Sequence, residues 1–372
     1  MRGLLGSLRS VGAGCLNRKS FTRIRNLHTL IVSGVCFPVD EDLPSLIRVS
    51  IGSAIHLGLA SGAMDAAPTT AYLLTYVEGK CVANCAFCAQ ARESSSRGDM
   101  LSRVTWPPFP TKDVVDAVAR SWNRGKLQRT CIQTVNHPTV FVETLATVRA
   151  IRDAAAMPVS VSCMPFSRVE MERLRDAGVE RMGIPLDAAT VELFDRVKGR
   201  AAGGPYRWDD HMGALGDAVS VFGRGRVSTH LMVGLGEVDR DLLGMVQAMI
   251  DMGVYPALFA FTPIAGSRLE SKPQPDLRRY HRIQLAHHLI TTGVSTFGRM
   301  AFDSEGGLTS FGVGEGLLRE VAGTGLPFMT SGCPGCNRPY YNERPGGKLF
   351  NYPARPKAEE TAKIMEDILG EG

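Results

Sequence analysis

The sequence lacks any run of about 20 apolar residues, so no transmembrane helix is expected. Nine cysteines are too few among 372 residues to indicate a disulfide-stabilised scaffold. No internal repeat is present beyond the strand–helix alternation described below. With 44% hydrophobic and 21% charged residues, the composition is typical of a soluble globular protein with one large domain plus additions.

Acidic residues are missing from the first 39 positions, which carry six arginine or lysine residues. Without these six, 36 basic residues face 37 acidic ones, so the rest of the chain has a net charge of −1. That balance gives no reason to expect nucleic acid as a partner. Residues 1–42 are therefore interpreted as a basic leader that is poorly ordered. Its composition fits a transit peptide and equally an extension from an upstream start codon.

Three cysteines are crowded into eight residues, as Cys81, Cys85 and Cys88. A lone cysteine usually packs as a small hydrophobic residue, but three on one loop are hard to explain by packing. Thiolates are soft ligands that select iron–sulfur clusters, zinc or copper(I). A structural zinc site or an electron-transfer cluster normally has four protein ligands. A triplet without a nearby fourth ligand therefore predicts a cluster with an open iron, with a zinc or disulfide cluster as the alternative.

A strand–helix alternation follows the triplet, and a strand-like run at 72–76 precedes it. Further strands are expected at 129–134, 158–163, 180–184, 226–233, 257–261 and 294–302. Helices are expected at 43–59, 111–123, 140–155, 167–177, 190–197, 208–221, 237–252, 277–292 and 356–369.

Apolar strands that alternate with helices indicate a parallel sheet with right-handed crossovers. The expected fold is α/β, a full or partial TIM-like barrel over residues 70–302. A lead-in at 43–69 precedes it, and an irregular C-terminal extension at 303–372 follows it. Active sites of such barrels lie at the C-terminal ends of the strands, which is where the triplet falls.

The spacing of the triplet, with Phe87 just before the last cysteine, resembles the radical S-adenosylmethionine (radical SAM) superfamily. The resemblance implies a [4Fe-4S] cluster whose open iron binds the methionine part of SAM. It further implies reductive cleavage of SAM to a 5′-deoxyadenosyl radical, which removes hydrogen from an unactivated carbon. Thiols that bind iron require a reducing compartment, so the expected location is the cytoplasm.

Four more cysteines lie outside the triplet. Cys131 falls in the second expected strand, Cys163 at the end of the third, and Cys333 and Cys336 in a Cys-Pro-Gly-Cys turn. Each strand cysteine alone is more typical of a core residue, and the turn alone resembles half a zinc knuckle. Adjacent parallel strands lie about 4.8 Å apart, however, so positions facing the barrel interior can share a ligand. The sharper hypothesis is a second iron–sulfur cluster held by both strand cysteines and one or both cysteines of the turn.

Over roughly residues 70–300 the chain is similar to biotin synthase, whose barrel holds a second cluster. The similarity includes the strand cysteines, the Leu186-Asp187 step and the turn at 234–237. Two positions depart from it. The third barrel cysteine of biotin synthase falls at Ser228, and its arginine ligand falls near Val294, where Arg299 is a weak substitute. The Cys-Pro-Gly-Cys turn is not expected there either, so a different cluster environment is implied.

The closer resemblance is to the archaeal-type, two-component lipoyl synthases, over most of residues 43–350. The segments that carry it are 69–76, 78–81, 89–92, 94–97 and 331–339. It implies sulfur insertion at C6 or C8 of an octanoyl group linked to a lysine of a carrier domain or peptide. It also implies a partner radical SAM subunit and a reducing electron donor. Because this family is prokaryotic, we favour the upstream start codon for the leader.

Under this resemblance, contacts to SAM are expected from the cysteine loop, from Gln133 and Thr134, and from the turn with Gly234 and Glu237. Asp187 is expected at the ribose of SAM or at the substrate. His137 and His230 are expected to be structural histidines. Glu343 and Arg344 are candidates to position a substrate or a partner, with a solvated tail as the equal alternative.

Three other functions stay open. One is a biotin synthase or another small-molecule sulfur insertase. Another is a radical SAM isomerase or methylase with a structural tail. The third is a non-enzymatic electron carrier or a zinc-stabilised adaptor.

Overall fold

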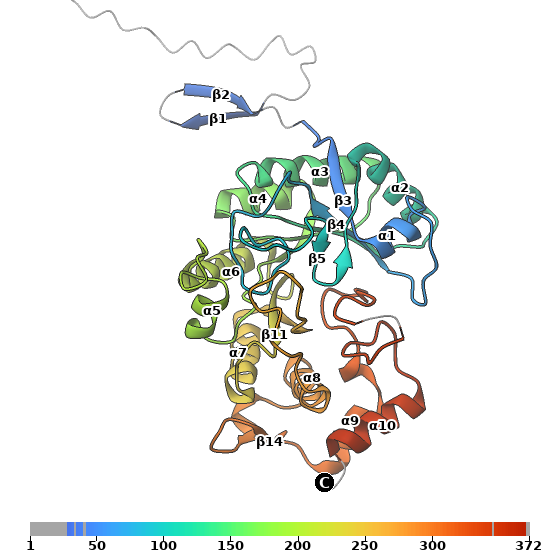
Figure 1. The fold of residues 1–372 in the computed structure, drawn as a ribbon, viewed down its shortest axis with the longest axis vertical. Helices are drawn as coiled ribbons and strands as arrows, with labels where there is room; N and C mark the ends of the chain where they lie inside the picture. Colours follow the sequence, from blue (N-terminus) through green and yellow to red (C-terminus); the bar gives the residue numbers. More distant parts are fainter. Residues whose placement is uncertain (1–27, 33–34, 40–41, 344–345, 370–372) are drawn as a thin grey trace, which may run out of the picture. The chain divides into compact units, whose positions relative to one another are not determined.

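The computed structural model describes residues 28–32, 35–39, 42–343 and 346–369 (Figure 1). The chain divides into two units, residues 1–41 and 42–372. The described residues of the first unit form an antiparallel hairpin of β1 (His28–Val32) and β2 (Val35–Val39). The predicted disorder of the leader concerns mainly residues outside the described part, and it stays a prediction. Among the described residues, no helix has the length and hydropathy needed to cross a membrane.

The second unit is built on an eight-stranded sheet with the order β12-β11-β10-β9-β8-β4-β3-β7. Six strands run parallel: β4 (Thr70–Thr75), β8 (Arg129–Gln133), β9 (Val159–Ser162), β10 (Val179–Gly183), β11 (Val227–Val233) and β12 (Val254–Ala260). Strand β3 (Leu46–Val49) extends the sheet antiparallel to β4, and β7 (Pro108–Pro110) pairs antiparallel with β3 at the edge of the sheet. The parallel α/β fold is confirmed, and in the described part of the chain it is a partial barrel.

Helices lie around the outside of these strands (Figure 1). They are α2 (Thr111–Asn123), α3 (Val140–Ala154), α4 (Arg168–Asp176), α5 (Val191–Val197), α6 (Trp208–Phe222), α7 (Asp239–Met252) and α8 (Leu277–Thr291). Strand β11 shows how the two faces of the sheet differ. Val227 and Leu231 are buried against the helices, whereas Ser228 and His230 line an interior cavity. Because side chains alternate along a strand, register decides which residues reach the barrel interior.

The first expected helix is partly wrong. Residues 46–49 form β3, and only α1 (Ile51–His56) is helical. The β3 residues pair with β4, Ile47 opposite Thr75 and Val49 opposite Leu73. Ser50 then begins the helix, because its hydroxyl accepts a hydrogen bond from the backbone of Ser53. Tertiary pairing has overridden a helix-like spacing of apolar residues.

The last expected strand, at 294–302, does not join the parallel sheet. Its residues form a 3₁₀ turn, η1 (Phe297–Arg299), and β13 (Ala301–Phe302), which pairs with β14 (Leu308–Ser310). The free edge of β12 is instead covered by the C-terminal extension. Leu258 N donates to Ser331 Oγ at 2.8 Å, and Asn342 Nδ2 donates to Ala260 O at 2.9 Å. These side chains satisfy polar groups that a seventh strand would otherwise pair.

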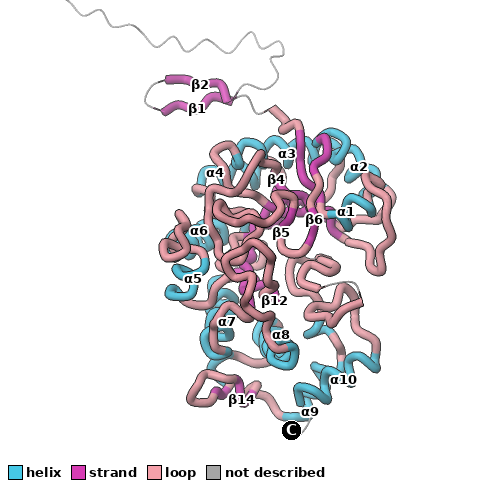
Figure 2. Tube along the Cα trace, viewed as in Figure 1, coloured by secondary structure: helices cyan, strands magenta, loops and turns pink. Residues whose placement is uncertain are grey.

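The C-terminal extension is mostly loop (Figure 2), apart from β14, α9 (Glu315–Gly323), η2 (Leu326–Phe328) and the expected closing helix α10 (Ala358–Leu369). Its segment 331–343 also reaches the first parallel strand. Thr69 N donates to Asn337 Oδ1 at 3.1 Å, and Asn337 Nδ2 donates to Ala67 O at 2.9 Å. The segment thus links the edge strand β12 to the start of β4, which brings Cys333 and Cys336 against the barrel interior.

Candidate active site

The cysteine loop follows β4 at the C-terminal ends of the parallel strands. Cys81, Cys85 and Cys88 are free thiols that line one cavity of about 180 Å³. Two backbone N–H groups point at sulfur: Ala83 N donates to Cys81 Sγ and Gln90 N to Cys88 Sγ, both at 3.4 Å. The loop therefore directs donors at sulfur atoms, an arrangement that favours thiolates.

Burial raises the pKa of Cys88 to about 11 and also raises the pKa values of Cys81 and Cys85. A metal group must supply the positive charge that holds such thiols deprotonated. Three soft thiol donors around one cavity fit an iron–sulfur cluster.

Three residues predicted from the sequence line the same cavity, namely Gln133 and Thr134 at the end of β8 and Asp187 after β10. Asp187 has a left-handed backbone, with φ of 67°, which is uncommon outside glycine. Its backbone is fixed against β11, because Asp187 N donates to His230 O at 2.8 Å and Met232 N donates to Asp187 O at 2.9 Å. A strained residue held this firmly is typical of a functional site.

Lys198, which the sequence reasoning missed, also lines this cavity. Its side chain is fully buried, and its Nζ donates to Asp187 Oδ2 at 2.7 Å and to Pro185 O. Its positive charge opposes the rise that burial causes in the pKa values of Cys81 and Cys85. Because removing two charges from water is costly, a buried ion pair at a cavity wall suggests function rather than stability. A lysine at a helix C-terminus is ordinarily a solvated residue, so no local signal marked it.

A second cavity, of about 680 Å³, adjoins the first. Cys131, Cys333 and Cys336 line it, and the walls of both cavities include Gln133 and His230. Cys131 lies two residues before Gln133 on β8, which places it about 7 Å further from the C-terminal end. The structure therefore brings a strand thiol and both thiols of the Cys-Pro-Gly-Cys turn beside the cavity of the triplet.

Comparison with known proteins identifies the domain. The family model of the radical SAM superfamily matches residues 77–249, which include the triplet, Gln133, Asp187 and Lys198. Residues 77–249 therefore resemble the radical SAM superfamily, and this resemblance implies a [4Fe-4S] cluster and SAM as cofactors.

The curated radical SAM relatives include biotin synthases. That of Chlamydia pneumoniae is 26% identical over 247 residues, covering 63% of this chain and 69% of the relative. That of Acinetobacter calcoaceticus is 24% identical over 216 residues, covering 56% and 61%. Among solved structures, methylornithine synthase matches with a TM-score of 0.47 at 12% identity, covering 60% of this chain and 63% of that one. The chain thus spans only about two thirds of the length of these proteins.

Gly234 and Glu237 are not among the residues that line the cavity of the triplet, and their contact with SAM stays a prediction. The Glu237 carboxylate accepts from Gly234 N at 2.8 Å and Gly236 N at 3.0 Å, and it pairs with Arg279 at 3.0 Å. Gly234 has φ of 105°, and a Cβ there would lie 2.9 Å from Pro275 Cδ. These residues shape the turn between β11 and α7.

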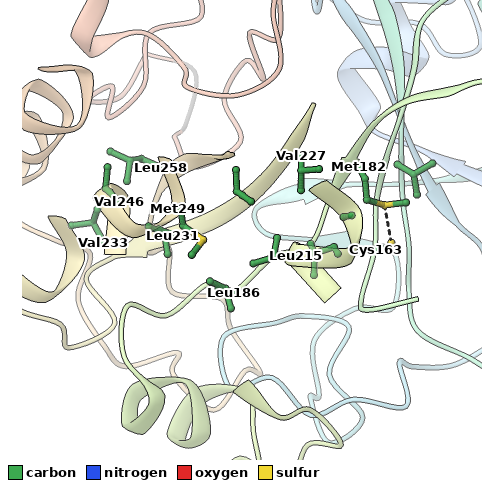
Figure 3. Close-up of a cluster of buried hydrophobic side chains, with 14 of the residues drawn as sticks. Cys163, Met182, Leu186, Leu215, Val227, Leu231, Val233, Val246, Met249 and Leu258 are labelled. Atoms are coloured by element: carbon green, nitrogen blue, oxygen red, sulfur yellow. Dashed lines mark hydrogen bonds between the residues drawn. The ribbon is translucent and has the colours of Figure 1, made fainter. Parts of the chain in front are cut away.

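Cys163 is also misplaced in the prediction. It is 1% exposed, and its Sγ lies 3.5 Å from Met182 Sδ in the core between sheet and helices (Figure 3). The residue paired with Cys131 across β8 and β9 is Ser160, whose Oγ lies 3.8 Å from Cys333 Sγ. Side chains alternate along β9, so a position three residues after Ser160 faces the opposite side of the sheet. Cys163 is therefore a core residue and not a cluster ligand.

A cation does accompany the second thiol group, but it is not Arg299, which lies exposed in η1. It is Arg338, whose guanidinium carbon is 3.8 Å from the centre of the Phe259 ring. Burial raises the pKa of the Cys336 thiol, and the charge of Arg338 opposes that rise. Tyr72 joins the group, because its hydroxyl lies 3.3 Å from Cys336 Sγ and accepts from Arg338 N at 2.8 Å.

The two histidines and the tail acid have structural surroundings. His137 contacts Glu143 at 3.4 Å, as a structural histidine would. His230 stacks on Phe259 at 4.6 Å between centroids, and burial lowers its pKa to about 4, so it is neutral. Glu343 is buried and accepts hydrogen bonds from the backbones of Asn342 and Asn351. Arg344 lies outside the described residues.

Proposed function

We propose that this chain is a radical SAM enzyme that inserts sulfur into an unactivated C–H bond of an octanoyl-lysine substrate. The observation that carries the proposal is the second thiol group, Cys131, Cys333 and Cys336, in a cavity that adjoins the one lined by the triplet. Sulfur insertion needs a hydrogen-abstracting group and a sulfur source within reach of the same carbon. Two adjoining thiol-lined cavities meet that requirement.

In this function, Cys81, Cys85 and Cys88 would hold the [4Fe-4S] cluster, and Gln133 and Thr134 would line the SAM site. The cluster and SAM, when bound, supply the radical chemistry that no acid–base side chain can provide at neutral pH. The chain contributes orientation and exclusion of water, because apolar side chains complete the wall. These are Leu74, Phe87, Met164, Met232, Phe261 and Ile264.

The second thiol group fits a second iron–sulfur cluster. Its three cysteines are free thiols from segments some 200 positions apart, brought together by the fold. The positive charge of Arg338 acts on both Cys131 and Cys336 and favours the anionic form of each thiol. Such a cluster, when bound, would supply sulfide. Ser160 and Tyr72 flank the thiols and offer oxygen atoms beside them.

The carrier substrate, a partner radical SAM subunit, an electron donor and a cytoplasmic location belong to this proposal. A second candidate is a small-molecule sulfur insertase, which the similarity to biotin synthases favours. The cavity wall carries serines at Ser160 and Ser228, and the tail supplies two thiols instead. A cluster bound here would therefore have a different environment from the one expected in biotin synthases. The candidate predicts sulfur insertion into dethiobiotin by this chain alone.

The test is anaerobic iron and sulfide counting on the full chain and on the Cys333→Ala/Cys336→Ala variant. We expect about eight irons in the parent and about four in the variant. Both proteins should form 5′-deoxyadenosine from SAM under reduction, and only the parent should add sulfur to an octanoyl-lysine peptide. A full second cluster in the variant would show that Cys333 and Cys336 do not hold it. A parent chain that forms no 5′-deoxyadenosine would refute the radical SAM activity.

A further inference from the structure

The second cavity extends well beyond its thiols. Its wall continues onto α1, the loop 63–68, Trp106 with the β5–β6 hairpin (Met100–Leu101 and Val104–Thr105), and Tyr340 of the tail. Since β3 runs antiparallel to β4, α1 lies beyond the N-terminal end of β4. The cavity therefore reaches from the SAM site to the opposite end of the strands.

We infer that this extension is the entrance for an unbranched acyl chain carried on an extended arm, which rests on the function proposed above. The outer wall is mainly apolar, with Ile51, Ile55, Met64, Ala66, Val104 and Trp106 beside the polar residues Ser50, Ser53, Asp65, Arg103 and Thr105. Burial of each methylene of a chain in such a channel contributes about 0.8 kcal/mol. The volume of about 680 Å³ lies within the usual range for small-molecule sites.

The polar groups along the channel indicate the direction in which the acyl chain of the substrate would lie. At the rim, the exposed Asp65 faces Tyr340, and burial together with this carboxylate raises the pKa of the tyrosine. These polar groups suit the amide and the arm of the substrate. At the inner end, the channel passes the second thiol group and meets the SAM cavity at Gln133, His230 and Phe259. The free end of the chain thus arrives between the two thiol groups.

This route separates the two ligands. SAM would occupy the cavity lined by the cysteine loop, whereas the acyl chain would enter beside α1. The channel therefore predicts that an acyl probe and SAM bind without competition. It also predicts that a carrier docks next to α1 and the loop 63–68, at the end of the barrel away from the cysteine loop.

Gly52 offers a direct way to block the channel. It lines the wall on α1, and a Cβ there would meet only Met64 Sδ, at 3.9 Å. Gly52→Trp therefore projects an indole into the channel, with Ala66→Trp as a second blocking variant. The matched control is Gly213→Trp on the exposed face of α6, where a Cβ meets nothing within 4 Å. Circular dichroism and melting temperature confirm that each variant folds.

The measurement is equilibrium binding of fluorescent peptides carrying butanoyl-, hexanoyl- or octanoyl-lysine to the reconstituted full chain. We expect the Kd to fall about fourfold per methylene, which is 0.8 kcal/mol converted at room temperature. The blocking variants should weaken octanoyl binding at least tenfold without changing SAM binding, and the control should match the parent.

The outcomes separate the channel from the proposed function. Unchanged octanoyl binding in both folded blocking variants, no dependence on chain length, or displacement by SAM would overturn the channel. Length-dependent binding blocked by Gly52→Trp, without any sulfur transfer, would support the channel and refute the function. Full sulfur transfer by folded Gly52→Trp would support the function and refute the channel.

Discussion

Replacing Cys163 and Cys131 one at a time tests the assignment of the second thiol group. The residues are alike in chemistry and lie on neighbouring segments of the sheet, but they face opposite sides. Cys163 is 1% exposed and contacts Met182, whereas Cys131 lines the large cavity. Cys163→Ala should therefore affect stability alone, and Cys131→Ala should affect metal content alone.

The expected magnitudes follow from these surroundings. Cys163→Ala removes one buried sulfur atom of about methylene size, which costs about 1 kcal/mol including a small cavity. Iron content should stay at about eight per chain. Cys131→Ala removes a group from an open wall, so the unfolding free energy of the metal-free chain should change by less than about 0.5 kcal/mol. After anaerobic reconstitution it should retain about four irons.

The assay combines urea unfolding of the reduced, metal-free chain with iron and sulfide counting and Mössbauer spectra after reconstitution. Cys131→Ser provides a second variant that conserves size. The reasoning fails if Cys163→Ala loses the second cluster at unchanged stability. It fails equally if Cys131→Ala and Cys131→Ser both keep a full complement of iron.

Three further predictions concern buried charges. Lys198→Met leaves the Asp187 carboxylate buried without its partner at 2.7 Å, so the unfolding free energy measured by melting and urea should fall by roughly 3–5 kcal/mol. The double variant Lys198→Met/Asp187→Asn should recover most of that loss. An unchanged unfolding free energy in the single variant would contradict the ion pair. Glu237→Ala removes the acceptor for two backbone N–H groups and the partner of Arg279. The unfolding free energy should therefore fall by roughly 2–4 kcal/mol while the Kd for SAM is unchanged. Weaker SAM binding at parental stability would instead support the predicted contact of Glu237 with SAM. The His287 ring donates to Pro256 O at 2.6 Å, packs on Tyr255 and adjoins His288, and burial lowers its pKa to about 4. The unfolded chain therefore takes up this proton first, so stability is complete above about pH 6.5 and declines by up to about 3 kcal/mol as the pH falls toward 4. Because burial also lowers the pKa values of His211, His230 and His281, His287→Gln should remove only its own share of that decline in pH-dependent unfolding, and an unchanged slope would exclude His287 as a contributor.

The sequence was a good guide wherever the structure depends on neighbouring residues. Helix α4 begins after Ser167, whose side chain forms a capping box with Glu170, and that helix was expected to end before Gly178. The parallel strands were found at their expected places to within a few residues, because short apolar runs between helices identify buried strands. Of the residues expected at the SAM cavity, Gln133, Thr134 and Asp187 line it because each follows a strand end.

Failures occurred where a second segment decides the outcome. Residues 46–49 became a strand because β4 offered an edge, and residues 301–302 left the sheet because the tail covers β12. Neither partner is visible in the local pattern. Lys198 follows the same rule, since only the packing of its helix against the cysteine loop buries its charge beside Asp187.

The sequence by itself determined the cysteine triplet and its place after a strand, because three thiols in eight residues remain together in any fold. It also determined that more thiols were available than one cluster needs. Only the tertiary structure decided which of them meet. Cys131 faces the interior and Cys163 the core because strand side chains alternate, and a shift of one residue reverses the face. Cys333 and Cys336 reach Cys131 only because the tail closes the open edge of the sheet.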